Sequence, residues 1–313
     1  MQFSRLAMAI KITKFWGASV GLAPYSSSNY SFYSNKYIVG TTTSVNTNYT
    51  GTGRLNQFYF ANGFRLNKHL SIGVQASVLF GSLMQNEVLN TDITTDSITT
   101  TRDLYLSKLL PKAGIQYHTK ISKNLQLNMG AAATAKASLN ANYSLTVQEG
   151  STVLINDSTI KQGYFAMPLN YTAGLSLVYK NALTLSADYQ AQHWGDVQYK
   201  GLGYSLTNSN RISAGLQYIQ QGKYYNYTCD KYYLQAGGYY SNSYLVVNGY
   251  QLKDAGFTLG AGATTKRGLV YQVNLQFGQR GTTNYGLIKE QYTQFGVSLF
   301  YRDFWRTKAK IYD

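Results

Sequence analysis

The sequence contains little charge, and this shortage is the first constraint on its class. Only 13% of its 313 residues are Asp, Glu, Lys or Arg, about half the fraction usual for a soluble domain. The 28 Lys and Arg residues exceed the 13 acidic residues, which gives a formal net charge of +15. The basic residues are scattered and form no nucleic-acid motif, so we expect no nucleic-acid partner. Anionic lipid headgroups are the expected counterpart of this charge.

Cysteine and histidine are also scarce. The single cysteine, Cys229, excludes a disulfide bond within the chain. The three histidines, His69, His118 and His193, lie far apart and match no metal-binding spacing. We therefore expect neither a metal site nor a cofactor.

Proline is rare, and two of the 3 prolines fall inside segments whose pattern predicts strands. Proline cannot donate a hydrogen bond to a β-ladder. Pro111 and Pro168 are therefore expected to kink or bulge their strands near one rim of the sheet. The alternative is that each marks the start of a strand.

Long apolar runs are absent, and no stretch approaches the roughly 18 apolar residues of a membrane helix. Near the N-terminus Lys11 and Lys14 interrupt the apolar run, so no signal peptide is predicted. The abundant residues are instead Tyr, with 30, and Gly, with 29. Together with many Asn, Thr and Ser, they are typical of a β-rich protein with an apolar outside and a polar inside.

Apolar and polar residues alternate along many segments, which predicts strands with one apolar face and one polar face. The polar face carries Gln, Asn, Ser, Thr and Gly with few charges, as expected of a wet, enclosed lumen. We predict an all-β fold, a transmembrane antiparallel β-barrel of about 13–14 strands with its apolar face toward lipid. The segment 70–80 illustrates the pattern, because its apolar side holds Leu70, Ile72, Val74, Ala76, Val78 and Phe80.

The connections between these segments alternate in length. Short, basic turns are predicted near 67–69, 119–124, 180–181 and 265–268. Long loops rich in Ser, Thr, Asn and Tyr are predicted near 25–52, 84–103, 144–163, 195–208 and 281–288. Short turns at one rim and long loops at the other are typical of outer-membrane barrels. A single strand is predicted over 124–142.

Two long segments carry a family resemblance: "RLNQFYFANGFRLNKHLSIGVQASVLFGSL" from Arg54 and "GQRGTTNYGLIKEQYTQFGVSLFYRDFWRTKAKIYD" from Gly278. They resemble outer-membrane barrels of Bacteroidota that are similar to the long-chain fatty-acid transport channels. The resemblance implies fourteen strands, an N-terminal hatch inside the lumen, and passage of hydrophobic molecules. The chain starts roughly where the second strand of such a barrel would lie. We therefore expect residues 1–313 to form one barrel domain that lacks the family's plug and first strand.

The leading functional hypothesis is passive transport of hydrophobic or amphipathic, fatty-acid-like molecules through the cell outer membrane. Outer-membrane lipid or lipopolysaccharide and a hydrophobic small molecule are the expected partners, and the chain is expected to act as a monomer. The alternative is a barrel that serves as a scaffold or shuttle in protein secretion or surface attachment. A continuous apolar pocket in the lumen would favour transport, whereas a polar-filled lumen with large ordered outer loops would favour the scaffold.

Enzymatic chemistry is not expected. A lipid-active barrel enzyme would need a Ser–His pair on the outer face, and no serine lies two residues from His193. Hydrolysis by paired carboxylates would need two acids to converge. Asp188 and Asp254 both point inward by alternation, but the sequence does not bring them together.

One polar set is a candidate site. By alternation Asp188, Asp254, Arg280 and Glu290 face the lumen, and buried charges should be paired. One interpretation is a network that braces a plug or selects solutes. The other is ion pairing that only stiffens the barrel wall.

Overall fold

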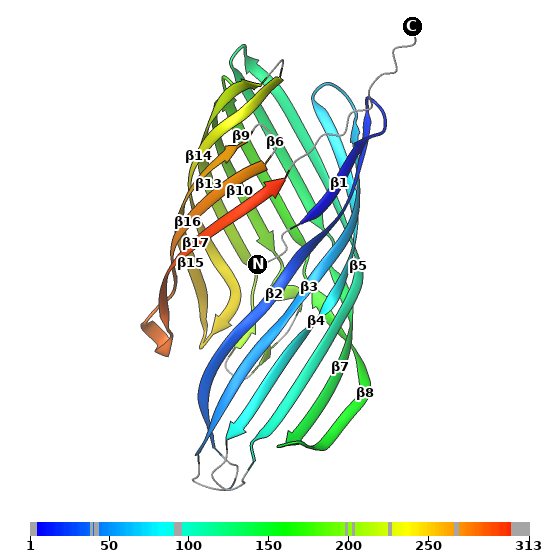
Figure 1. The fold of residues 1–313 in the computed structure, drawn as a ribbon, viewed down its shortest axis with the longest axis vertical. Helices are drawn as coiled ribbons and strands as arrows, with labels where there is room; N and C mark the ends of the chain where they lie inside the picture. Colours follow the sequence, from blue (N-terminus) through cyan, green and yellow to red (C-terminus); the bar gives the residue numbers. More distant parts are fainter. Residues whose placement is uncertain are drawn as a thin grey trace. The chain divides into compact units, whose positions relative to one another are not determined.

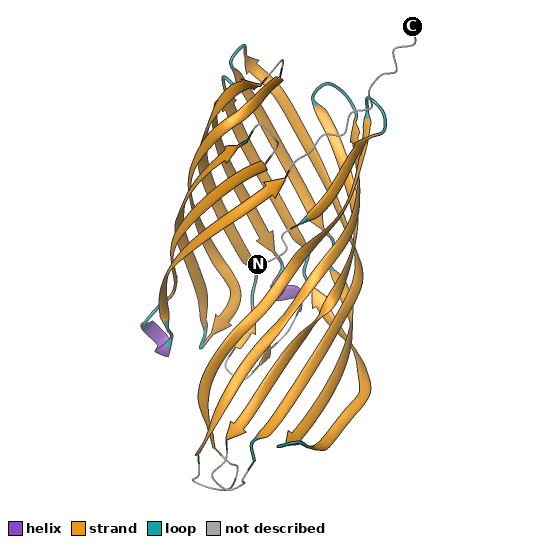
Figure 2. Ribbon diagram, viewed as in Figure 1, coloured by secondary structure: helices purple, strands orange, loops and turns teal. Residues whose placement is uncertain are grey.

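The computed structural model describes residues 5–37, 40, 44–90, 96–197, 200–201, 204–224, 227–265 and 269–301. Nearly all of them lie in strands, which confirms the all-β prediction (Figure 2). No helix in these ranges is long and apolar enough to cross a membrane. The strands are β1 (Leu6–Lys11), β2 (Trp16–Tyr37), β3 (Ser44–Arg65), β4 (Leu70–Asn90), β5 (Ile98–Ser122), β6 (Leu125–Thr134), β7 (Ala137–Glu149), β8 (Thr152–Met167), β9 (Asn170–Tyr179), β10 (Leu183–Gln192), β11 (Lys200–Gly201), β12 (Tyr204–Leu206), β13 (Ser209–Tyr224), β14 (Tyr227–Val247), β15 (Tyr250–Thr264), β16 (Leu269–Gly281) and β17 (Lys289–Tyr301), with two short 3-10 segments, η1 (Trp194–Val197) and η2 (Asn284–Gly286).

Pairing is antiparallel, and most strands pair with their neighbours in sequence. β1 to β4 form one run of hairpins, and β13 to β17 form another, in which the strands lie side by side (Figure 1). Within the described residues, the pairings that skip strands include β5 with β7, β6 with β9, β10 with β13, and β12 with β14.

The chain divides into two compact units. Unit 1 comprises Met1–Gly114 and Ala133–Leu169, and unit 2 comprises Ile115–Ala132 and Asn170–Asp313. The two prolines lie at these borders. Pro111 is inside β5, shortly before the chain leaves unit 1, and its carbonyl accepts a 3.4 Å hydrogen bond from the backbone of Ala135. Pro168 is buried in the break between β8 and β9.

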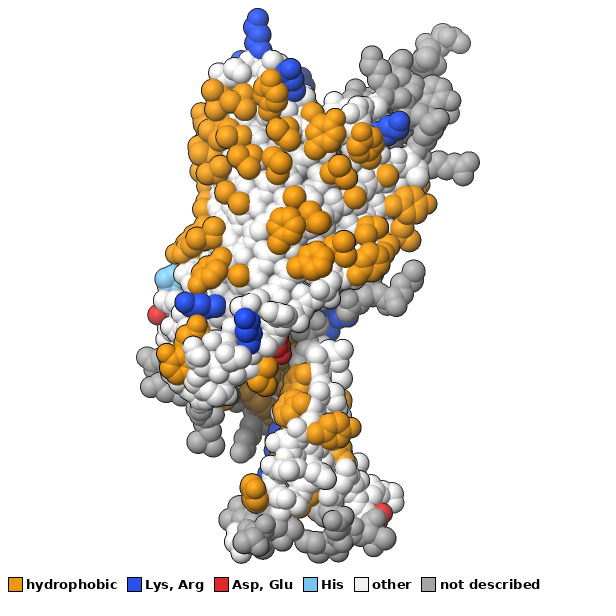
Figure 3. All heavy atoms as spheres, turned by 90° about the vertical axis from the view of Figure 1, so that its left-hand side faces the viewer, with side chains coloured by type: hydrophobic (Ala, Val, Ile, Leu, Met, Phe, Trp, Pro, Cys, Tyr) orange, Lys and Arg blue, Asp and Glu red, His pale blue; other side chains and the backbone are white. Residues whose placement is uncertain are grey.

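In unit 2 the apolar side chains are the exposed ones. Along β15 exposed and half-buried residues alternate without interruption from Lys253 to Thr264. Phe257 and Leu259 lie on the exposed side, and Thr258 lies on the other. We call the less exposed, polar side the inner face and the apolar side the outer face. Figure 3 shows the outer face of β13–β16 studded with apolar side chains, as predicted for contact with lipid.

Unit 1 adds an apolar core that the alternation did not predict. Six inward-facing residues from β3, β4, β5 and β7 are at most 6% exposed and contact one another: Leu55, Leu79, Leu106, Leu110, Leu139 and Ala141. Phe165 and Met167 of β8 pack against this leucine core. These six inner positions of unit 1 are therefore closed by packing.

The predicted long loops at 25–52, 84–103 and 144–163 are largely wrong. β2 continues to Tyr37 and β3 begins at Ser44, β4 continues to Asn90, and β7 and β8 form a hairpin across 137–167. These segments are polar but rich in Thr and Tyr, which are strong strand formers. Their backbone ladder therefore continues past the length needed to cross a bilayer. The loops at 195–208 and 281–288 do contain irregular turns, η1 and η2.

The single strand predicted over 124–142 is also wrong. The structure has β6 and β7 instead, separated at Ala135 and Lys136. β6 pairs with β9, whereas β7 pairs with β5 and β8. The two pieces share an alternating pattern, so their sequence does not mark the change of partner. The turn predicted at 265–268 lies mostly outside the described residues.

Candidate functional site

The candidate site lies on the inner face of unit 2, where the strand register aligns polar residues into rows. One row runs from Ser241 through Asp254 and Arg280 to Glu290 on β14 to β17. Residues directly opposite each other in antiparallel strands project to the same side of the sheet. The register therefore places Asp254, Arg280 and Glu290 on one face.

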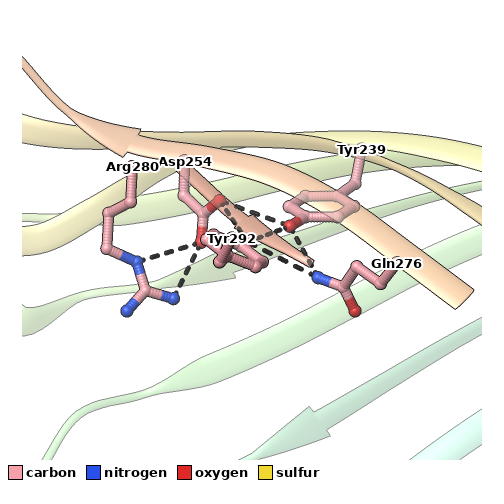
Figure 4. Close-up of polar contacts among 5 residues, drawn as sticks. All are labelled: Tyr239, Asp254, Gln276, Arg280 and Tyr292. Carbon is pink, nitrogen blue, oxygen red and sulfur yellow. Dashed lines mark hydrogen bonds and ion pairs between the residues drawn. The ribbon is translucent and has the colours of Figure 1, made fainter. Parts of the chain in front are cut away.

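Asp254 is the centre of this site. Arg280 donates from Nη2 and Nε to Oδ2 of Asp254 at 3.0 Å and 3.3 Å. The hydroxyls of Tyr292 and Tyr239 donate to Oδ1 at 2.8 Å and 3.3 Å. Figure 4 shows these side chains converging on the carboxylate from β14, β16 and β17. A carboxylate has about four acceptor positions, and protein donors lie within hydrogen-bond distance of both oxygens of Asp254.

The two tyrosines reach each other across two intervening strands. Their hydroxyl oxygens lie 2.5 Å apart, and Nε2 of Gln276 donates to Tyr239 at 2.8 Å. The guanidinium of Arg211 lies 4.0 Å from the centre of the Tyr239 ring, within cation–π range. This arrangement, the tyrosine bridge, ties β14 to β17 above β15 and β16.

Glycine makes room for the tyrosine bridge. In the register, Tyr239 is opposite Gly256, Gly256 is opposite Gly278, and Gly278 is opposite Tyr292. A Cβ on Gly256 would lie 2.7 Å from the Tyr239 hydroxyl, and one on Gly278 would collide with the Tyr292 ring. Each ring therefore lies flat over a backbone that has no side chain.

The four residues predicted for this site are only partly brought together. Asp254 and Arg280 form an ion pair. Glu290 is opposite Arg280 in register but is exposed, and no ion pair joins the two within the described residues. Asp188 lies on β10 against Gly174 of β9, and three ladder steps lead from it to Gly256, two residues from Asp254 on β15. The two carboxylates therefore do not form a catalytic pair.

The sequence-based interpretation missed Tyr239, Tyr292 and Gln276. Only the register shows that these tyrosines flank two facing glycines. Pairs of Tyr and Gly at equal distances from a shared turn are the signal that could have suggested it.

This geometry suits bracing, because the donors to Asp254 come from three different strands. Among the described residues, no group of three His, Cys, Asp or Glu side chains could hold a metal ion. On the outer face His193 lies 5.7 Å from the Tyr171 ring centre, and its Nδ1 is 3.9 Å from Asp196.

A second polar cluster surrounds Glu87 in unit 1. Lys36 donates to Oε1 of Glu87 at 2.5 Å, Arg102 donates to Oε2 at 3.4 Å, and the Tyr49 hydroxyl lies 3.4 Å from Oε1. Glu87 is 4% exposed and lies 17 residues along β4 from Leu70. A membrane strand needs about 9–11 residues, so Glu87 lies beyond the bilayer. Burial works to raise its pKa, but the hydrogen bond and charge of Lys36, with the charge of Arg102, outweigh burial and hold that pKa below the usual range.

Replacing Glu87 with glutamine is expected to lower the stability of the protein at neutral pH. A lowered folded-state pKa gives stability that is fully present above the unfolded value, about 4.3, and is lost as pH falls through the folded value. The stability gap between wild type and E87Q should therefore close below about pH 4. Urea titrations from pH 3 to 8 measure it. A gap that stays constant down to pH 3 would contradict this assignment, and E290Q, at an exposed site, is the control.

Comparisons with known proteins place this geometry in a family. The model of the BamG family matches residues 1–312. The chain is similar in structure to the Pseudomonas putida toluene transporter TodX, with a TM-score of 0.59 and 16% identity over 96% of this chain and 82% of that chain. The Ralstonia pickettii toluene transporter TbuX gives 0.58 and 14% over 94% and 79%, and the CymD monoaromatic hydrocarbon channel gives 0.56 and 15% over 95% and 82%. At these identities the likeness shows the fold, an antiparallel β-barrel. No curated protein matches the chain in sequence.

Proposed function

Because the chain belongs to the BamG family and has a channel-type β-barrel fold, we propose that it is a non-enzymatic outer-membrane barrel that serves as a docking scaffold for other proteins. The observation that carries this proposal is the long hairpin region of unit 1. β2, β3, β4 and β5 have 22, 22, 21 and 25 residues. A membrane strand needs about 9–11 residues, so roughly half of each strand extends beyond the bilayer.

Two features make this extension a rigid platform. The leucine core includes Leu79, which lies nine residues along β4 from Leu70, and its packing fixes the base of the hairpins. Further out, buried Glu87 joins Lys36 of β2 to Arg102 of β5. This extramembrane segment is already ordered by its own core and its own ion pairs. A partner that binds it therefore does not have to pay the entropic cost of ordering the surface.

The outer part of β2 carries the residues expected at a protein interface. Tyr33 and Tyr37 are 79% and 70% exposed, and Phe32 of the same strand is 51% exposed. Tyrosine and phenylalanine are enriched at interfaces, because they supply a large contact area at low entropic cost. The proposed partner is a protein that presents an apolar patch at the membrane surface.

The inner faces of the two units favour the scaffold proposal over the proposal of an open channel for hydrophobic molecules. In unit 2 the inner face is lined by Ser, Thr, Gln, Asn and Gly and is crossed by the tyrosine bridge. In unit 1 the inward apolar side chains are packed against one another. A site that binds hydrophobic molecules is normally an open, mostly apolar cavity.

The test is to change the exposed tyrosines without touching the barrel. The double substitution Tyr33→Ser and Tyr37→Ser is expected to release the chain from its assembly when outer membranes are solubilised mildly and resolved on a native gel. Heat-modifiable mobility should stay unchanged, because neither side chain contacts the core. Tyr285→Ser, which removes a 62% exposed tyrosine of η2, is the matched control. A wild-type chain that migrates as a free monomer would refute the scaffold.

The second candidate is passive passage of small hydrophobic molecules, favoured by the fold shared with two toluene transporters and a monoaromatic hydrocarbon channel. It makes a different prediction in the same cells. Uptake of a hydrophobic compound should fall when the chain is deleted and should recover fully with the Tyr33→Ser, Tyr37→Ser variant. The scaffold proposal predicts instead that any change in uptake caused by the deletion is also seen with this variant.

A further inference from the structure

An apolar groove crosses the outer face of unit 2. It has a volume of about 460 Å³, and its walls are formed by Leu216, Leu234, Leu259, Val273 and Leu275. These side chains belong to the lipid-facing side of β13 to β16, so the groove opens toward the membrane. The groove exists because two small residues, Ala236 and Ala261, form its floor.

The alanines interrupt rows of larger residues. One row of the ladder reads Leu185, Leu216, Ala236, Leu259, Leu275 and Phe295 across β10 and β13 to β17. The next row toward the short turns reads Leu183, Tyr218, Leu234, Ala261, Val273 and Val297. Ala236 and Ala261 are diagonal neighbours across β14 and β15. The missing side-chain volume at these two places forms one continuous depression.

One end of the groove lies at a polar, basic edge. Tyr218 lines the groove and donates its hydroxyl to Oε1 of Gln220 at 2.8 Å, toward the end of β13. In the same row Tyr218 is opposite Leu183, and Leu183 is opposite Tyr179. Lys180 follows in the β9–β10 turn, exposed, with its Nζ 5.3 Å from the Tyr179 ring centre. Two ladder spacings, about 10 Å, therefore separate this cation from the groove.

We propose that the groove binds an acyl chain of an anionic phospholipid whose phosphate lies beside Lys180. The groove supplies apolar contact along the chain, and tyrosines next to lysine suit the glycerol and phosphate level of a bilayer. The short turns of unit 2 add Lys120 and Lys123 to the same basic character. The site is independent of the docking and passage roles, since it lies on the opposite face from the inner polar rows.

The experiment uses the full-length chain in micelles, with native mass spectrometry after incubation in equal amounts of phosphatidylglycerol, phosphatidylethanolamine and lipid A. Wild type is expected to retain phosphatidylglycerol preferentially. The double substitution Ala236→Leu and Ala261→Leu fills the groove, and losing contact with about two methylenes should weaken retention about tenfold. Lys180→Gln should lower the preference for phosphatidylglycerol over phosphatidylethanolamine about fivefold while leaving the groove intact.

Ala255→Leu is the matched control, because Ala255 is an exposed outer-face alanine of β15 that does not line the groove. It should bind as wild type does. Heat-modifiable mobility verifies that each variant is folded. Equal retention by wild type and the groove-filled variant would overturn the proposal, as would preferential retention of lipid A by wild type.

Discussion

Replacing Gly81 with alanine is expected to lower the free energy of unfolding by about 3 kcal/mol or more. Gly81 of β4 has φ of +149°, which side-chain-bearing residues rarely adopt. A Cβ there would also collide with the backbone carbonyl oxygen of Arg54 on β3. A backbone atom cannot move aside as a flexible side chain could, so the strain must distort the β3–β4 ladder next to the leucine core.

The midpoint of urea unfolding, followed by the shift in gel mobility, measures this loss. Gly63→Ala is the control, because a Cβ on Gly63 of β3 would have no heavy atom within 4 Å. That variant should unfold close to wild type. Equal midpoints for the two variants would show that the backbone at Gly81 is unstrained.

Replacing Asp254 with alanine is the second large effect, a loss of about 2 kcal/mol. Arg280 and the hydroxyls of Tyr239 and Tyr292 would lose their shared acceptor, which leaves three donors near the inner face without it. The Arg280 side chain is 54% exposed, so water limits the ionic share of this loss. Thermal unfolding of the purified barrel measures it.

Two further variants measure how much individual groups of the polar network contribute to stability. Tyr292→Phe removes one hydroxyl and keeps the ring over Gly278, so it should cost about 1 kcal/mol. Asp254→Asn keeps an acceptor oxygen, so its loss of stability should lie between those of Asp254→Ala and Tyr292→Phe. Uptake of small solutes should be equal for all of them if the network only braces the wall. A stable Asp254→Ala barrel with altered uptake would instead assign it a role in solute selection.

Alternation alone was sufficient to predict which face of a membrane-length segment points outward. Along β4, Ile72, Val74 and Val78 are exposed at 38%, 51% and 44%, while Ser77 between them is 4% exposed. The low charge of the opposite face indicated that these apolar residues point outward to lipid. That prediction holds because side-chain direction in a strand depends only on parity.

The strand lengths and the leucine core could not be predicted in the same way. Beyond the bilayer the outer face of a hairpin contacts water instead of lipid, so the pattern no longer distinguishes a polar strand from a loop. Leu79 and Leu106 have the same parity as polar inner residues, and only their meeting across β4 and β5 buries them. Similarly, the tyrosine bridge depends on the register of four strands, which no single segment encodes.

The leucine core also means that apolar side chains are removed from water in two different ways, by lipid in one region and by protein packing in another. Phe257 and Leu259 leave water only when lipid covers the outer face of β15. Leu79, Leu106 and Leu139 are covered by the protein itself and are at most 1% exposed. Stripping lipid from the barrel would therefore remove the hydrophobic stabilisation of one region and leave the other with an interior like that of a water-soluble protein.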